Sequence, residues 1–228
     1  MFEAAELGRT LSKMEFERRL PELRARLVQA QFALEEAKIP VMIIVSGVDG
    51  AGKGDVVHRL NQWLDPRGLE THAFEHEMEE ERERPFYWRF WQALPPRGRI
   101  RLLFGSWYTG PVIRRVYGKT KNAQLDAALQ RIVFFEEMLA RDGTLFVKRW
   151  FHLSEAALHQ RLHDLQDNPE THWRVLPTDW AHRKLYGRFA RGSRRGSQPR
   201  RIAATRGVGS NLRCSDNVGG DQCGQENR

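Results

Sequence analysis

The residues from Gly47 to Lys53, Gly-Val-Asp-Gly-Ala-Gly-Lys, are the part of the sequence best suited to chemistry. Glycines leave backbone N–H groups free to curl around an anion, and the Lys53 ammonium adds a mobile positive charge. A short apolar run, 41–46, precedes this loop, and apolar residues at helical spacing follow it to Leu64. A strand, a glycine loop and a helix in this order are typical of phosphate binding. The predicted phosphate-binding residues are Gly47, Gly50, Ala51, Gly52, Lys53 and Gly54.

One position of the loop departs from the common pattern. The residue after the lysine is usually Ser or Thr, whose hydroxyl helps to hold Mg²⁺. Here that residue is Gly54. A metal would need another oxygen ligand, and Asp49 or Asp55 is the local candidate. Asp49 could instead form a turn, because Asp-Gly is a good turn pair.

Basic residues gather further along the chain, between 161 and 188, and alternate there with aromatic residues. A mobile basic helical pair above a phosphate loop can act as a lid that excludes water and neutralises charge. Arg161 and Arg174 are the arginines that we expect to contact phosphate. The alternative is a solvated helix face with ordinary surface arginines.

Other polar groups are weaker candidates. The acidic run from Glu77 to Glu83 favours a solvated face over a metal cluster. His152 and His163 are expected to be non-catalytic, since we find no metal-ligand spacing around them. The third strand ends without an acid, although phosphate-loop kinases usually carry a Mg²⁺-binding acid there.

The elements that must position these residues alternate between strands and helices. Strands are predicted at 41–46, 69–74, 99–105 and 144–151, and helices at 11–37, 56–64, 77–93, 123–141 and 155–166. This alternation indicates an α/β fold with a mostly parallel sheet covered on both faces. In the long N-terminal helix, Leu23 is expected on the apolar face, and Pro21 should kink the helix or start a new one.

Composition narrows the function classes. With 228 residues and 40% hydrophobic residues, the chain can build one large or two small domains. No apolar stretch is long enough for a membrane span, so we expect a soluble, cytoplasmic protein without a membrane partner. The two cysteines, Cys214 and Cys223, give no disulfide or metal pattern.

Charge is concentrated at one end of the chain. The net charge is +8, but eight arginines and three acids lie in residues 190–228, which leaves +3 for the rest. The body of the protein therefore gives no reason to expect a nucleic-acid partner. Residues 190–228 lack apolar periodicity, and two interpretations stand: a disordered basic tail, or a stretch translated out of frame. The predicted division is a helical segment at 1–38, a phosphate-loop domain with its lid at 39–189, and this tail.

Several motifs together resemble the polyphosphate kinase 2 family. The loop from Gly47 to Gly54 looks like the family's Gly-x-Asp-x-x-Gly-Lys-Gly, and Ser106-Trp-Tyr108 looks like part of its Asp-Arg-Ser-Trp-Tyr-Asn-Arg segment. The lid region is also similar, at Trp173-Arg174 and Pro177-x-Asp179. Within the family, the chain resembles the first of the two fused copies found in polyphosphate:AMP phosphotransferases.

The resemblance implies a P-loop kinase-like sheet with a helical lid. It also implies phosphoryl transfer between inorganic polyphosphate and a nucleotide, most simply AMP to ADP, with Mg²⁺ as cofactor. Lys53, Asp49 and Arg115 stand on matching positions and are the expected catalytic residues, with Asp49 as the expected metal ligand. The long N-terminal helix is compatible with packing against the sheet or against a partner subunit in a homo-oligomer.

The sequence departs from the family where transfer would occur. Phe104 and Gly105 replace the family's Asp and Arg, Thr109-Gly110 replaces Asn-Arg, and Arg114 replaces a Glu. Loss of a metal-binding carboxylate and an arginine would weaken transition-state stabilisation. Two alternatives therefore stay open beside the transferase: a catalytically degenerate domain acting in assembly or polyanion binding, and an ATP-dependent small-molecule kinase.

Overall fold

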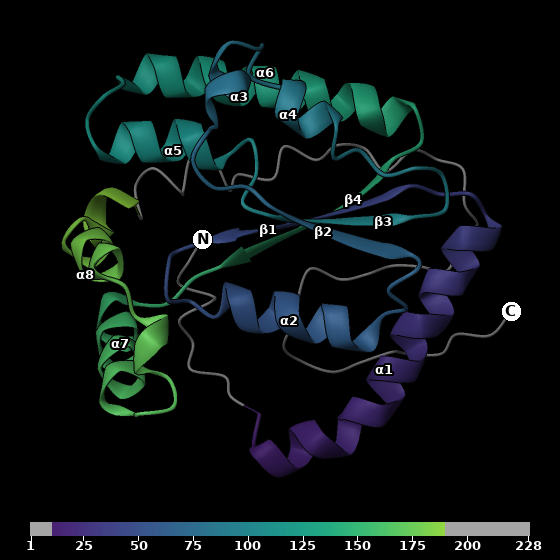
Figure 1. The fold of residues 1–228 in the computed structure, drawn as a ribbon, viewed down its shortest axis with the longest axis horizontal. Coiled ribbons are helices and arrows are strands. Elements are labelled where there is room, and N and C mark those ends of the chain that lie inside the picture. The colour runs from purple at the N-terminus through teal and green to yellow at the C-terminus, as the bar shows by residue number, and fades with distance from the viewer. Residues whose placement is uncertain (1–10, 190–228) are drawn as a thin grey trace, which may run out of the picture.

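A computed structural model describes residues 11–189, and Figure 1 shows their arrangement as a parallel sheet between two layers of helices. The strands are β1 (Val41–Gly47), β2 (Leu69–Ala73), β3 (Ile100–Phe104) and β4 (Leu145–Phe151). Their order in the sheet is β2-β3-β1-β4, and all three pairings are parallel. The predicted fold class is confirmed. The predicted tail, 190–228, lies outside the described residues.

The helices supply the layers on either side of the sheet. They are α1 (Lys13–Glu36), α2 (Lys53–Trp63), α3 (Glu79–Arg82), α4 (Trp88–Trp91), α5 (Thr109–Val116), α6 (Asn122–Arg141), α7 (Glu155–Asp167) and α8 (Pro177–Lys184), with a short 3-10 turn, η2 (His172–Arg174). Figure 1 shows α1 and α2 on one face and α3 to α6 on the other, with α7 and α8 beside the end of the sheet.

The central strand β1 explains the two layers. Successive side chains of a strand point to opposite faces. Met42 and Ile44, both at most 1% exposed, therefore join a core on the α4 and α6 side. Val41 and Val45 join a second core on the α1 and α2 side. A strand buried on both faces reads as a continuous apolar run, which is why the sequence revealed it.

The prediction of one continuous helix over 77–93 is wrong. The chain forms two single-turn helices, α3 and α4, with Pro85 between them. Proline removes a backbone donor and ends helices, so the segment turns there. Arg89 of α4 reaches back to Glu81 of α3, with 3.2 Å between Nε and Oε1, and both side chains are at most 11% exposed. The acidic run is therefore only partly a solvated face.

The sequence patterns gave no indication of α5. Gly110 and Pro111 stand in its first turn, and both are poor helix formers elsewhere. Proline is tolerated at the start of a helix, where its missing N–H has no intrahelical partner. The short apolar stretch after it then packs as a helix, with Val112 and Val116 buried.

The N-terminal helix follows its prediction with one exception. α1 continues through Pro21, and its ribbon bends in the N-terminal half (Figure 1). Leu27 and Leu34 pack against the second core, but Leu23, predicted on the same face, is 43% exposed. Across residues 11–189, no helix combines the length and apolarity needed to cross a bilayer.

Candidate phosphate-binding site

The phosphate loop follows β1 directly and is held against β4. Gly47 has a φ of +137°, and a Cβ there would lie 2.1 Å from the carbonyl oxygen of Phe151, so only glycine fits. The N–H of Val48 donates to the same oxygen at 3.0 Å. Helix α2 then begins at Lys53, and the free N–H groups of a first turn can bind an anion. The predicted strand, loop and helix are present.

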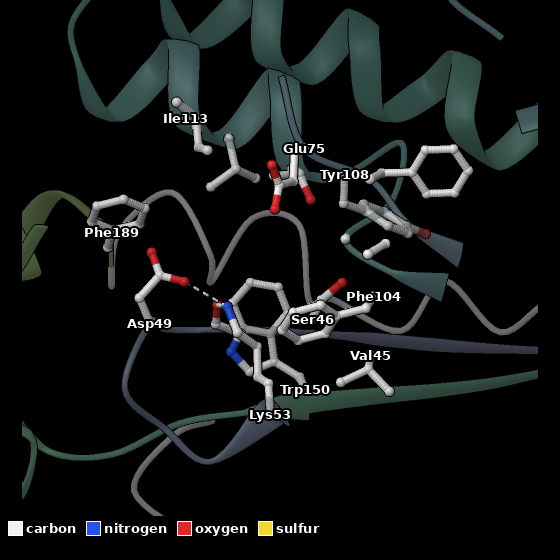
Figure 2. Close-up of a pocket in the computed structure, with 16 residues that line it drawn as sticks. Val45, Ser46, Asp49, Lys53, Glu75, Phe104, Tyr108, Ile113, Trp150 and Phe189 are labelled. Carbon is white, nitrogen blue, oxygen red and sulfur yellow. Dashed lines mark hydrogen bonds and ion pairs between the residues drawn. The ribbon is translucent and has the colours of Figure 1, made fainter. Parts of the chain in front are cut away.

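Lys53 turns back into the loop that precedes it. Its Nζ donates to the carbonyl oxygen of Gly47 at 2.9 Å and to Oδ1 of Asp49 at 2.7 Å (Figure 2). Burial opposes ionisation of Asp49, but Lys53 and then His182 outweigh it, so the pKa of Asp49 lies below its ordinary value. Asp49 is therefore a carboxylate at neutral pH. It forms an ion pair with the Lys53 ammonium, the group with which a bound phosphate would otherwise pair.

The lid reaches the loop through two carboxylates. Arg161 of α7 and Arg174 of η2 donate to the two oxygens of Asp55, at 2.8 and 2.5 Å. His182 of α8 lies 2.7 Å from Oδ2 of Asp49, measured from its Nδ1. Burial raises the pKa of Asp55, but the two arginines outweigh it and lower that pKa overall. The predicted phosphate contacts Arg161 and Arg174 do lie together beside the loop.

Apolar packing supports these polar contacts. Leu158 and Leu162 of α7 are each 2% exposed and form a small core with Val48 of the loop. The lid therefore rests on the loop through a hydrophobic cluster as well as through ion pairs.

The end of β3 carries no carboxylate, and the residue that follows it lies close to the end of β2. Gly105 follows Phe104 with a φ of +82°, and a Cβ there would lie 2.7 Å from the carbonyl oxygen of Phe74 at the end of β2. An arginine at Gly105 would require the backbone to move. The main chain at Gly105 therefore has no room for an arginine side chain as it stands.

Glu136 of α6 is a site residue that sequence reasoning missed. It is 1% exposed, and it accepts hydrogen bonds from Trp107 Nε1 at 3.0 Å and from the Tyr108 hydroxyl at 2.8 Å. Lys148 of β4 donates to its other oxygen at 2.7 Å. The Ser-Trp-Tyr motif thus owes its position to a buried carboxylate 28 and 29 residues away in sequence.

Two predicted positions lie apart from this cluster. Arg115 stands in the last turn of α5, and its Nε donates to Asn122 at 2.7 Å. It does not line the cavity next to Lys53. Gly54 faces open space, with no atom within 4 Å of where a Cβ would stand. The roles assigned to both residues stay predictions.

His163 of α7, which is expected to be non-catalytic, has a second histidine beside it. His163 is paired with His159 at the four-residue spacing of a helix, with ring centroids 4.5 Å apart, and both rings pack on Trp180. Over residues 11–189, no three His, Cys, Asp or Glu side chains gather closely enough to hold a metal ion. The histidine pair is therefore part of the packing between α7 and α8.

Comparison with known proteins decides the family. The family model described as polyphosphate kinase 2 matches residues 10–195. This chain belongs to the polyphosphate kinase 2 family. A polyphosphate:AMP phosphotransferase of Pseudomonas aeruginosa is 45% identical over 190 residues, which are 83% of this chain and 38% of that protein. One from Pseudomonas syringae pv. tomato is 41% identical, over 84% of this chain and 39% of that protein. The chain thus spans less than half the length of these two curated relatives.

Solved structures of the polyphosphate kinase 2 family agree with the fold. A crystal structure of a polyphosphate kinase 2 from Pseudomonas aeruginosa has a TM-score of 0.74 and 42% identity, covering 87% of this chain and 41% of the other. A polyphosphate kinase 2 from Arthrobacter aurescens has a TM-score of 0.76 and 29% identity, covering 82% and 68%.

Proposed function

We propose that the chain moves a phosphoryl group between inorganic polyphosphate and a nucleotide, with AMP to ADP as the leading reaction. The observation that carries this proposal is the convergence of Lys53, Arg161 and Arg174 on one glycine loop at the start of α2. A polyanion is the ligand that such a set of donors suits best. Family membership and the names of the two Pseudomonas relatives support the choice of polyphosphate and AMP.

The residues act by positioning and charge neutralisation, which is most of what phosphoryl transfer asks of a protein. Lys53 Nζ and the loop N–H groups hold terminal phosphate oxygens. Arg161 and Arg174 exchange their Asp55 partner for the polyanion, and the lid then excludes water from the loop. Arg115 contributes charge from α5. A cytoplasmic location is part of the proposal, because it follows from a nucleotide substrate.

The proposal includes Mg²⁺, for which the loop offers few protein ligands. Magnesium in kinases is commonly held by one or two carboxylates together with substrate phosphates. Asp49 suits one such contact, because it is ionised and lies in the loop, although both of its oxygens are engaged by Lys53 and His182. Bound there with the phosphates, the ion would neutralise charge that builds on the transferred group.

The test is ADP formation from AMP, polyphosphate and Mg²⁺, with the Lys53→Ala variant beside the wild type. We expect turnover that falls at least about a hundredfold in Lys53→Ala, because the lysine neutralises charge in the transition state. Lys13→Ala is the matched control, since Lys13 lies on the exposed side of α1. Absence of turnover from a folded wild-type chain would contradict the proposal.

A second function is favoured by the end of β3. Phe104 offers no metal ligand, and the path at Gly105 leaves no room for an arginine. A degenerate domain that captures ligands or serves in assembly fits these two residues better than an efficient transferase does. It predicts polyphosphate or nucleotide binding without ADP formation in the same assay.

A further inference from the structure

A cavity of about 240 Å³ lies between the phosphate loop, the ends of the strands and α5 (Figure 2). Aromatic and aliphatic side chains make up most of its wall: Phe74, Phe104, Tyr108, Val112, Ile113 and Trp150. Burying the charged oxygens of a phosphate chain against these groups would carry a large desolvation penalty. The body of the cavity therefore does not suit polyphosphate.

Charged groups stand at two sides of this cavity. Lys53 and Asp49 border it from the phosphate loop, and Glu75, just after β2, borders it from the other side. Figure 2 draws the Glu75 carboxylate toward the cavity, across from Lys53. Within residues 11–189 that carboxylate accepts no hydrogen bond and forms no ion pair, so it is available to a ligand. Trp150 adds an indole Nε1 that is buried and lacks a hydrogen-bond partner among the same residues.

A flat ring joined to a phosphate satisfies both parts of this arrangement. Nucleobases stack on aromatic side chains, and each such contact is worth about 1–3 kcal/mol. A cavity of about 240 Å³ has room for a ring system. Lys53 and Phe104 line the same cavity, so one nucleotide could contact both.

The Glu75 carboxylate would discriminate between nucleobases by the hydrogen-bond donors that they carry. A carboxylate in this position can only accept hydrogen bonds, so it favours a base with an N–H donor at its edge. An exocyclic amino group, as in adenine, supplies that donor.

We propose that this cavity binds the amino-bearing base of a nucleoside monophosphate, with Glu75 as the hydrogen-bond acceptor and Lys53 at the phosphate. The inference rests on the proposed function only in taking a nucleotide as the ligand. It gives Phe104 a role: the residue that replaces the family's acid forms an apolar wall for a ring. The cavity would then serve nucleotide recognition at the position where the family resemblance implies an acid.

The test is calorimetric titration of the whole chain with three ligands and no polyphosphate. The ligands are AMP, purine riboside 5′-monophosphate, which is AMP without its amino group, and ribose 5-phosphate. We expect AMP to bind about tenfold more tightly than the des-amino compound, as one hydrogen bond to a charged acceptor predicts. Ribose 5-phosphate should bind more weakly than either.

Variants identify the residues responsible. Glu75→Gln should remove most of the difference between AMP and its des-amino analogue, while Glu80→Gln, an exposed acid in α3 that does not border the cavity, should leave it unchanged. Phe104→Asp should weaken both nucleotides but not ribose 5-phosphate, and circular dichroism must show that it folds. Equal affinity for all three ligands in the wild type, or an unchanged preference for AMP in Glu75→Gln, would overturn the proposal.

The same measurements separate this inference from the proposed activity. Selective AMP binding without ADP formation would leave the cavity assignment standing and contradict the transferase. Polyphosphate-dependent turnover with the same KM for AMP in Glu75→Gln would support the transferase and contradict the cavity assignment. Lys53→Ala should weaken all three ligands alike, because they share the phosphate.

Discussion

Glu136 illustrates how one side chain can fix a motif. Its two oxygens accept from Trp107, Tyr108 and Lys148, and so join the segment after β3 to α6 and β4. Burial, and then the Glu136 charge, raise the pKa of Tyr108 far above its ordinary value, so the phenol stays a donor. Tyr108, one of the aromatic residues that line the cavity, is held in place by this buried carboxylate.

Glu136→Ala should destabilise the fold by about 3 kcal/mol, because buried donors lose their acceptor and Lys148 loses its counter-charge. Urea unfolding measures the change in the free energy of unfolding. Glu137→Ala, at the next position of α6, is the matched control and should stay within about 0.5 kcal/mol of the wild type. Equal losses in the two variants would argue against a structural role for the network.

Gly105, just after β3, and Gly118, just after α5, form a matched pair of glycines for testing the close backbone approach at Gly105. Both have positive φ, but a Cβ meets the Phe74 carbonyl oxygen at 2.7 Å only at Gly105, and nothing lies within 4 Å at Gly118. We expect Gly118→Ala to lose about 1 kcal/mol for the left-handed conformation. Gly105→Ala should lose clearly more, since a steric clash is added. Thermal or urea unfolding compares the two, and similar losses would refute the close approach.

At the scale of elements, the lid is joined to the phosphate loop by acids that ligand phosphates would displace. Asp55 pairs with Arg161 and Arg174, and Asp49 pairs with His182. The two arginines of the lid are thus already turned toward the first turn of α2. A polyanion needs to replace carboxylates rather than to reorganise helices.

These contacts should make stability depend on acid pH. The folded pKa of Asp55 lies below its ordinary value of 3.8, so its contribution is complete above about pH 4 and is lost as the pH falls further. Asp55→Asn should therefore be less stable than the wild type at pH 6, by up to about 1 kcal/mol for a partly exposed pair. The gap should narrow as the pH falls below 3.8.

Urea unfolding at pH 6, 4 and 3 checks this expectation. Asp142→Asn, at the end of α6, is a control acid outside the lid contacts and should show no such closing gap. A gap that stays constant across the series would mean that ionisation of Asp55 does not support the lid.

Much of the fold could be predicted because its signals are local. The run 41–46, the glycine loop and α2 are contiguous, so their pattern indicated a strand, an anion loop and a helix. The break at Pro85 within 77–93 and the short helix α5 were not predicted. Short apolar stretches around Pro and Gly show too little periodicity to indicate a helix. Contacts such as Asp49 with His182 join residues 133 positions apart, and no spacing rule reaches that far.

The whole molecule carries its excess charge unevenly. Residues 1–189 hold only +3 of the net +8, so the proposed polyanion binding would depend on where the cations stand and not on their number. Lys53, Arg161 and Arg174 stand at one end of the sheet, while Arg97 lies before β3 and therefore at the other end.

We therefore expect polyphosphate to stabilise the folded chain by binding at the end of the sheet that carries Lys53, Arg161 and Arg174. At a hundredfold excess over Kd, a ligand adds about 2.7 kcal/mol, which raises the melting temperature. We expect the double variant Arg161→Ala/Arg174→Ala to lose most of this shift and Arg97→Ala to keep it. Scanning calorimetry with and without polyphosphate measures the shift. The same shift in all three proteins would mean that binding is not localised at the loop.

The place of β1 between β3 and β4 also governs how the chain assembles during synthesis. β1 emerges from the ribosome first among the strands, yet its partners are Ile100–Phe104 and Leu145–Phe151. The N–H of Val48 has its acceptor at Phe151, so the phosphate loop closes only after residue 151 has left the exit tunnel. Parallel pairings of this sequence separation form slowly. Until then the apolar β1 is exposed to chaperones and to aggregation, and slower translation or lower temperature should raise the yield of folded protein.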